Sequence, residues 1–220
     1  LFDIMKDWSQ IQVFKKAAQI GMSVAMNIKA FFVARSPRFH FNTIYTLPSD
    51  SDVWEFVPTK TDKIIFSNQA IRDIVKTNKV EMKEIGDRFI HFKGTRSKTA
   101  PIMTTADLLI HDELDRSDQN IVEQYESRVS RSKFKGIWYL SNPSVVNAGV
   151  DRYWKLSDKK EWFVSCKRCN HQQFLTFDSN INLTTAEYIC ANCQSPLSDE
   201  DRRRGYWKAL NPGAEISGYH

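Results

Sequence analysis

The stretch KAAQIGMS, residues 16–23, carries the residue types of a phosphate-binding loop in an unusual order. The common form, G-x-x-x-x-G-K-[ST], has its lysine directly before the Ser or Thr. Here that position is Met22, and Lys16 opens the loop instead. Gly21 would let the backbone approach a phosphate, Lys16 has a stem long enough to fold back over the loop, and Ser23 would ligate magnesium. An ordinary strand-to-helix connection can have the same residues, so the loop alone leaves both interpretations open.

A pair of carboxylates follows a second apolar run, in ADLLIHDELD. Asp112 and Glu113 would lie at the C-terminal end of that strand, which is the edge where α/β sheets bind ligands. Asp112 would hold magnesium through water, and Glu113 would orient and deprotonate an attacking water. The alternative is an acidic turn whose carboxylates, Glu113 and Asp115, are simply solvated.

A third apolar run, GIWYLSNPS, ends in Ser141 and Asn142 before Pro143. Small polar side chains at this point can bond a terminal phosphate or the attacking water. The sequence S-N-P-S is also good turn chemistry, which is the simpler interpretation. Three strands that end in a phosphate loop, an acid pair and a polar sensor, in this order, favour a nucleotide-hydrolysing site.

The four cysteines form two C-x2-C pairs, Cys166 with Cys169 and Cys190 with Cys193. Two such pairs about twenty residues apart supply four thiolates in a tetrahedral array, which is typical of a structural zinc site. Disulfides are the alternative, and an intracellular protein disfavours them. The basic residues around the pairs, including those of DRRRGYWK, would either contact phosphates or form a solvated rim.

Short strands and helices must position these residues. Strands are predicted at 11–14, 42–47, 88–92, 107–111 and 136–140. Helices are predicted at 22–34, 50–57, 68–77 and 118–132, the last with Asp118 as N-cap. The alternation indicates an α/β fold with a mainly parallel sheet. KVEMKEI and DRFIHFKG, around Gly86, predict an antiparallel hairpin.

Size and composition set the outer limits. The 220 residues can form one full core and a small second module, and the net charge of +5 permits a polyanionic partner without requiring one. Apolar runs are too short to cross a bilayer, and the start lacks the pattern of a signal peptide, so we expect an intracellular protein with no membrane partner. The chain begins with Leu1 and is expected to be a fragment.

Together these motifs resemble the large terminase subunit of tailed phages, in particular its lambda-like (GpA) type. That family has its loop lysine in front, as K-x-A-x-x-G-x-S, which residues 16–23 match. LLIHDE resembles the family's acid motif with its catalytic glutamate, and YLSNPS resembles its coupling motif. The resemblance covers nearly the whole chain, including IYTLPSDSD and the cysteine-containing region.

The resemblance implies a P-loop NTPase of the ASCE/RecA-like class at 1–155, a small β-rich zinc ribbon at 156–210, and at 211–220 the start of a linker to a nuclease domain. The chain stops where that domain should begin, so we expect no DNA cleavage from these residues. The implied activity is ATP hydrolysis that drives double-stranded DNA into procapsids. The implied assembly is a homo-oligomeric ring in the host cytoplasm, with the portal protein and the small terminase subunit as partners.

The resemblance also implies roles for individual residues. Glu113 and Lys16 would be catalytic, and Ser23 and Asp112 would hold Mg²⁺. ATP would be bound by Lys16, Ala17, Ala18, Gln19, Ile20, Gly21, Met22, Ser23, Asp112, Ser141 and Asn142. A ring ATPase is further expected to insert an arginine at its neighbour's γ-phosphate, an interaction worth about 10³ to 10⁵ in rate. Arg96 in HFKGTRSKTAP is the candidate, with Arg128 and Arg131 as alternatives.

Two other functions remain open at this point. A helicase-like ATPase with a zinc module should keep G-K-[ST] and have a second RecA-like domain, and neither is visible. A nonenzymatic zinc-ribbon DNA-binding protein would give no role to Lys16 or Glu113.

Overall fold

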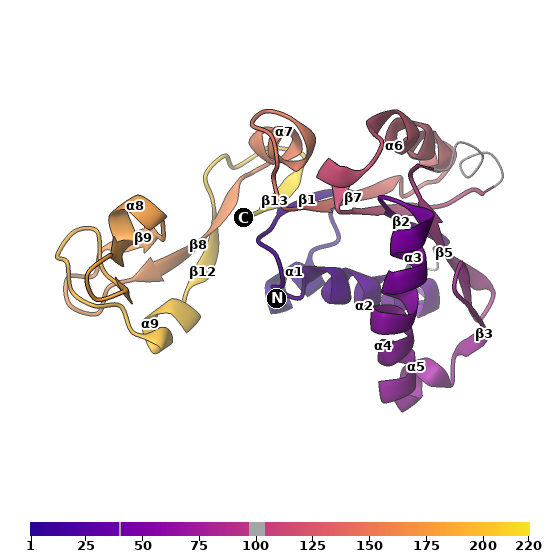
Figure 1. Cartoon of the computed structure of the whole chain (residues 1–220), viewed down its shortest axis with the longest axis horizontal. Helices are drawn as coiled ribbons and strands as arrows, with labels where there is room; N and C mark the ends of the chain where they lie inside the picture. The colour runs from indigo at the N-terminus through magenta and orange to yellow at the C-terminus, as the bar shows by residue number, and fades with distance from the viewer. Residues whose placement is uncertain (40, 97–103) are drawn as a thin grey trace.

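The computed structural model describes residues 1–39, 41–96 and 104–220, and a long mixed sheet is its central feature (Figure 1). Its strands are β1 (Ile11–Lys15), β2 (Thr43–Leu47), β3 (Val75–Lys79), β4 (Met82–Ile85), β5 (Arg88–Gly94), β6 (Leu108–Asp112), β7 (Gly136–Ser141), β8 (Lys160–Ser165), β9 (Gln172–Phe174), β12 (Tyr206–Ala209) and β13 (Ser217–Tyr219). Within the described ranges their order is β12-β8-β13-β1-β7-β6-β2-β5-β4-β3, with β9 beside β8. All five predicted strands are present, within one or two residues of the predicted bounds.

The middle of the sheet is parallel. β13, β1, β7, β6, β2 and β5 pair in parallel, so their C-terminal ends share one edge. β4 pairs antiparallel with β5 through the turn at Gly86, which adopts a positive φ of 65° as a tight hairpin needs. The α/β class, the mainly parallel sheet and the hairpin were therefore predicted correctly.

Helices cover both faces of this sheet. They are α1 (Phe2–Lys6), α2 (Met22–Arg35), α3 (Asp50–Phe56), a π-helix η1 (Val57–Thr61), α4 (Asp62–Ser67), α5 (Gln69–Arg72), η3 (Leu114–Arg116), α6 (Gln119–Glu126), η4 (Ser127–Val129), α7 (Gly149–Leu156), α8 (Phe177–Asn180) and α9 (Asp199–Arg203). Asp118 caps α6 as predicted, because its side chain accepts from the N–H groups of Asn120 and Ile121. No helix in the described ranges is long and apolar enough to span a bilayer.

One predicted helix, 68–77, is wrong in its second half. Only α5 is helical, and β3 begins at Val75. Ile71, Ile74 and Val75 have helical spacing, and each packs against the main core as the spacing requires. The antiparallel pairing of β3 with β4 nevertheless takes Val75 onward into the sheet, so a tertiary contact overrides the local pattern.

Alternation along the strands divides the apolar residues between two cores. Phe14, Tyr45 and Trp138 face the core that α2 and α3 complete, whereas their neighbours Val13 and Tyr139 face the side of α6 and α7. Figure 1 shows these helices on opposite sides of the sheet. With both faces packed, the parallel strands are rigid supports for the loops at their C-terminal edge.

The C-terminal region departs from the expected boundaries. Residues 217–219 form β13, which pairs with β1 and β8 within the main sheet, where the sequence was expected to begin a linker at 211–220. Tyr219 explains the difference, because its ring stacks on Phe14 and its hydroxyl donates to Asp7 at 2.8 Å. β8 and β12 leave this sheet as an antiparallel pair and carry the cysteine-containing region, which also holds the short strands β10 (Ile181–Asn182) and β11 (Glu187–Tyr188) (Figure 1).

Candidate active site and cysteine centre

The loop of residues 16–23 connects β1 to α2 at the C-terminal edge of the sheet. Gly21 is the N-cap of α2 with a φ of 81°, and Gln19 also adopts a left-handed conformation, with a φ of 62°. No side chain caps this 14-residue helix, so its first N–H groups are available to an anion. The loop lines a cavity of about 300 Å³ together with Lys60 and Glu113.

A second, apolar cavity of about 180 Å³ adjoins the first. The two share Lys16, Ile20 and Met22. The remaining walls of the second cavity come from the two ends of the chain and include Ile4, Trp207 and Tyr219. Sequence reasoning did not find this cavity, because its walls are distant along the chain.

Lys16 lies against both carboxylates of the acid pair. Its Nζ is 2.8 Å from Oε1 of Glu113 and 4.0 Å from Oδ1 of Asp112. Lys16 and Asp112 are buried, whereas the Glu113 side chain is 29% exposed and lines the loop cavity. The lysine from β1 and the acids from β6 are therefore brought together across the intervening β7, next to the loop.

Asp112 is held by hydrogen bonds from a neighbouring strand and from α2. The Tyr45 hydroxyl donates to its Oδ2 at 2.7 Å, and the Ser23 side chain also bonds it. Burial raises the pKa of Asp112, and Lys16 and these two hydrogen bonds oppose that rise. Ser23 and Asp112, the predicted magnesium ligands, are thus adjacent. Tyr45 was not predicted, because in the sequence it appears as one aromatic residue within a strand.

Glu113 has a strained backbone. Its φ of 55° and ψ of 46° are left-handed, which is uncommon for a residue with a side chain. Its N–H donates to Oδ1 of Asp112 at 3.0 Å. Strain of this kind, about 1–3 kcal/mol, persists where surrounding contacts impose it, and it turns the Glu113 side chain toward the cavity and Lys16.

The polar residues after β7 are placed less directly. The Ser141 hydroxyl is buried, donates to the Asn142 carbonyl at 3.1 Å and accepts from the Asp115 N–H at 3.1 Å, while the Ser141 carbonyl accepts from the Lys16 N–H. Asn142 is exposed and does not line the loop cavity. Ser141 therefore adjoins the loop through backbone, with its hydroxyl already bonded within the turn.

Asp115 connects the acid turn to the segment after β7. Its Oδ2 accepts from the Ser144 N–H at 2.8 Å, and its Oδ1 accepts from the Val150 N–H at 2.8 Å, at the start of α7. A Cβ on Gly149 would lie 2.4 Å from that Oδ1, so a glycine is needed there. Asp115 is thus bonded rather than simply solvated.

The candidate arginines lie apart from the acid pair. Arg96 follows β5 at the C-terminal edge and is exposed, and its side chain has no hydrogen bond or ion pair to the rest of the described chain; residues 97–101 of its segment lie outside the described residues. Arg128 and Arg131 lie near the opposite edge, by the start of β6. Lys60, from the π-helix, is a cation at the cavity that sequence reasoning missed, because a π-turn has no periodic signal.

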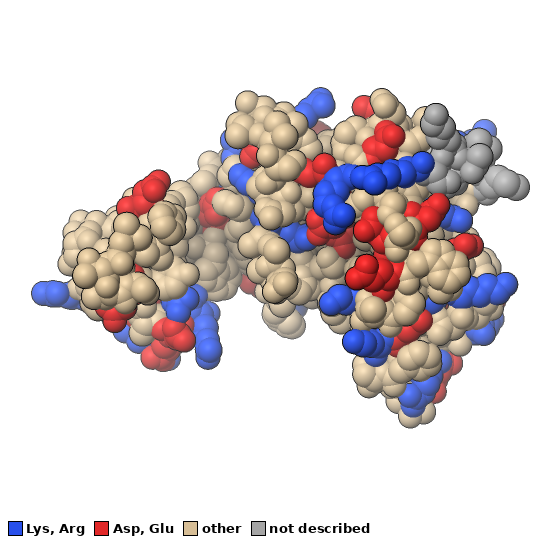
Figure 2. All heavy atoms as spheres, viewed as in Figure 1, with Lys and Arg blue, Asp and Glu red and all other residues tan. Residues whose placement is uncertain are grey.

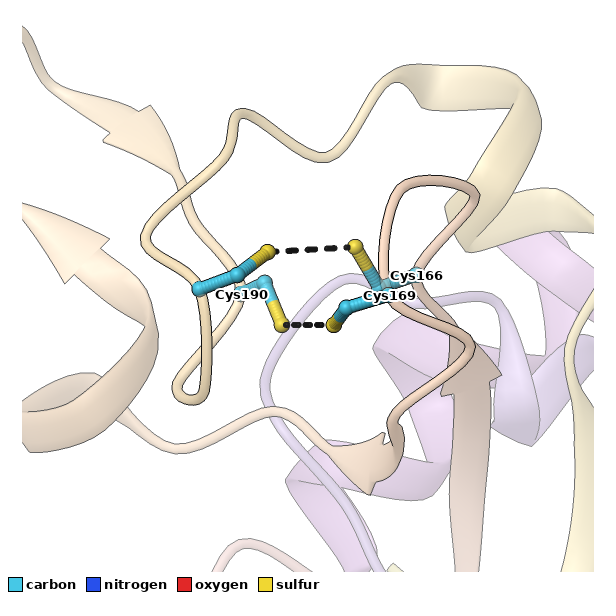
Figure 3. A group of neighbouring side chains, drawn as sticks. Cys166, Cys169 and Cys190 are labelled. Carbon is cyan, nitrogen blue, oxygen red and sulfur yellow. Dashed lines mark hydrogen bonds between the residues drawn. The ribbon is translucent and has the colours of Figure 1, made fainter.

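The four cysteines converge in the part carried by β8 and β12. Their sulfurs lie within 4.8 Å of one another, and Cys166–Cys193 and Cys169–Cys190 are each 3.7 Å apart (Figure 3). All four are free thiols.

The two C-x2-C turns have the same backbone form. The N–H of the fourth residue after each first cysteine, Asn170 and Gln194, bonds back to the Cys166 and Cys190 carbonyls. Asn170 and Gln194 each have a φ of 57°, the left-handed position that glycine often fills.

The thiols of this cluster differ in acidity. Hydrogen bonds from the Ser195 side chain and backbone lower the pKa of Cys193 to about 6, whereas burial raises the pKa of Cys166 to about 11. Four convergent sulfurs with backbone N–H donors beside them fit a tetrahedral metal site of the Cys₄ type.

The basic residues near the cysteines are largely paired. Lys167 contacts Glu200 and Asp201, and Arg204 contacts Glu200. Arg202 also pairs with an acidic neighbour, Asp199. Figure 2 shows Lys and Arg intermixed with Asp and Glu on the viewed face. The pairing favours the solvated rim over a phosphate-binding surface.

Comparison with known proteins was made for the whole chain. A family model described as the phage terminase large subunit gpA, ATPase domain, matches residues 2–213. The large terminase ATPase domain of Thermus phage P74-26 covers 100% of this chain, and this chain covers 78% of it, at 12% identity and a TM-score of 0.56. A point mutant of that domain gives 79% and 76% coverage, 14% identity and a TM-score of 0.57. No match was found among curated proteins.

The chain spans 35% of the large terminase of another phage, described as a thermophilic bacteriophage, which covers 63% of this chain at 14% identity and a TM-score of 0.49. Similarity to the Thermus phage domain supports the fold, whereas the family model covers nearly all residues, including the loop, the acid pair and the cysteines. The chain belongs to the family of phage terminase large subunit gpA ATPase domains.

Proposed function

We propose that this chain hydrolyses ATP, with Lys16 as the cation on the terminal phosphates and Glu113 as the general base. The observation that supports this most is the position of the Lys16 amine, 2.8 Å from Glu113 and 4.0 Å from Asp112, beside the loop cavity. The front lysine thus supplies the positive charge that Met22 cannot. A nonenzymatic protein would have no need for a buried lysine at this point.

The two adjoining cavities suit the two ends of a nucleotide. The polar cavity has the loop N–H groups, Lys16 and Lys60 for the phosphates. The apolar cavity, with Trp207 and Tyr219, suits the base.

Lys16 also determines when Glu113 can act. Without nucleotide its amine is bonded to the Glu113 carboxylate, which is thereby occupied. Phosphate oxygens in the loop would attract the amine, and Glu113 would then be free to orient and deprotonate water. Ser23 and Asp112 would hold Mg²⁺, which would neutralise charge on the phosphates. Tyr45 would keep the Asp112 carboxylate in place.

At the level of the whole protein, we propose the motor part of a DNA-packaging terminase. The family membership supports this, and with it double-stranded DNA as partner, a homo-oligomeric ring, the portal protein and small terminase subunit, and the host cytoplasm as the location. Arg96 remains the proposed arginine finger, and Ser141 and Asn142 the proposed γ-phosphate sensors. The cysteines would hold one structural Zn²⁺. We retain 1–155 and 156–210 as proposed domains, with β13 returning to the first.

DNA-stimulated ATP turnover of the intact chain tests the enzymatic proposal. Lys16→Ala and Glu113→Gln should each lower turnover by about 10³-fold, and Glu113→Gln should still bind ATP. Lys63→Ala is the matched control, because Lys63 is exposed on α4 and does not line either cavity. Wild-type turnover in both site variants would reject this proposal and the helicase-like alternative together.

A further inference from the structure

A polar cavity lies at the edge of the sheet opposite the loop, near the N-terminal ends of β2, β5 and β6. Its volume is about 600 Å³, and Asn42, Arg88, Asp107, Arg128 and Arg131 line it. Asp107 and Asp112 are at opposite ends of β6, so this cavity is about 17 Å from the acid pair. We call it the arginine pocket. It is separate from the proposed ATP site.

The three arginines are the distinctive feature of the arginine pocket. They come from two separate segments, and none of their guanidinium groups has an ion pair or hydrogen bond within the described ranges, whereas Arg202 and Arg204 each contact a carboxylate. The Nε atoms of Arg88 and Arg128 are buried with no hydrogen-bond partner there. Buried guanidinium N–H groups without acceptors are unfavourable, so an external acceptor would stabilise them.

The one carboxylate among the described lining residues is already bonded within the framework. Asp107 accepts from the Asn42 N–H at 3.1 Å and from the Ser132 hydroxyl at 2.8 Å. Three guanidinium groups against one committed carboxylate leave an excess of positive charge. Guanidinium groups match phosphate oxygens in charge and in geometry, so the ligand is expected to carry phosphate.

The lining also indicates what carries the phosphate. Its described residues include no aromatic side chain, so they offer nothing on which a base could stack. Single-stranded nucleic acid is usually bound through such stacking, whereas a duplex turns its bases inward and presents phosphates. We propose that the arginine pocket binds backbone phosphates of duplex DNA, independently of sequence. The proposed packaging function is used here only to choose DNA as the polymer.

Equilibrium binding of a labelled duplex to the full chain, without ATP and over a range of salt concentrations, tests the proposal. Arg131→Gln is the principal variant, because Arg131 is exposed and its loss should not affect folding. We expect weaker binding to all duplex sequences and a slope of log K against log salt lower by about 0.9 per lost phosphate contact. Arg128→Gln should act in the same direction.

Lys133→Gln removes the same charge two residues away, at an exposed site that does not line the pocket, and is the matched control. Equal affinity and slope in Arg131→Gln and Lys133→Gln would overturn the proposal, as would tighter binding of a single strand than of the duplex.

The phosphate could instead belong to ATP on a neighbouring subunit. In that case Arg131→Gln would lower DNA-free ATP turnover and leave DNA affinity unchanged, which would also overturn the proposal. Failure of the proposed ATPase would appear separately, as full turnover in Lys16→Ala.

Discussion

Replacing Lys16 with methionine should destabilise the folded protein, independently of any effect on turnover. Methionine keeps the length and apolar stem of the side chain but removes the amine between Glu113 and Asp112. Asp112 would then be a buried carboxylate without a cation, held only by neutral hydrogen bonds such as that from Tyr45. The perturbation isolates the charge of Lys16 from its packing.

The expected magnitude follows from the distances. At 4.0 Å the attraction between Lys16 and Asp112 is about 4 kcal/mol at an effective dielectric constant of about 20. The shorter contact with Glu113 adds less than its distance suggests, because that side chain is 29% exposed and solvent screens it. Breaking a buried pair on one side usually costs about 3–5 kcal/mol. We expect a loss of about 3 kcal/mol, or roughly 6–12 °C in Tm for a chain of this size.

Urea unfolding and thermal melting of Lys16→Met, Asp112→Asn and the double variant form the assay, with Lys63→Met as an exposed control within about 0.5 kcal/mol of wild type. The double variant should be much less destabilised than the sum of the two single variants. Burial raises the pKa of Asp112, so the folded state binds its proton at a higher pH than the unfolded state. The deficit of Lys16→Met should therefore shrink as the pH falls through that raised pKa. Wild-type stability in Lys16→Met, with additive effects in the double variant, would refute the contact on which this reasoning depends.

The remaining predictions concern the cysteines, a buried lysine and the acid turn. Metal analysis after dialysis should find one zinc per chain, and chelation should speed hydrogen exchange in residues 160–200 but not in α2; no metal, or exchange that is unchanged by chelation, would exclude the site. Burial lowers the pKa of Lys29 to about 7, so between pH 7 and about 10 the unfolded state binds the extra proton and stability should rise with pH. Urea midpoints should show this rise in wild type and not in Lys29→Met, and parallel pH curves would contradict it. Asp115→Ala should cost about 1–3 kcal/mol and speed exchange at the Ser144 and Val150 amides, and retained protection there would rule out its bonds to both.

Local motifs were predictable because their chemistry depends on neighbours in sequence. The loop of residues 16–23 needs a strand before it, a helix after it and Gly21 at the turn, and all three signals are contiguous. The two C-x2-C turns are likewise local, and their spacing alone predicted convergence of the sulfurs. The hairpin at Gly86 follows from turn chemistry in the same way.

Other features depended on partners far along the chain. Residues 68–77 have helical spacing, yet pairing with β4 makes Val75 onward a strand. The stretch 211–220 has no strong strand signal, and β13 forms because Tyr219 stacks on Phe14 and bonds Asp7. Such contacts join the two ends of the chain, and no local pattern encodes them.

The sequence by itself therefore determined which groups do chemistry: a front lysine, an acid pair and four thiols. Only the tertiary structure decided how they meet. Parallel pairing placed the ends of β1 and β6 at one edge, so that Lys16 lies between Glu113 and Asp112, with Tyr45 behind them. The same sheet placed Arg88, Arg128 and Arg131 at its other edge. The physical reason is that a side chain's acceptors, burial and charge partners are set by neighbours in space, which chain order does not specify.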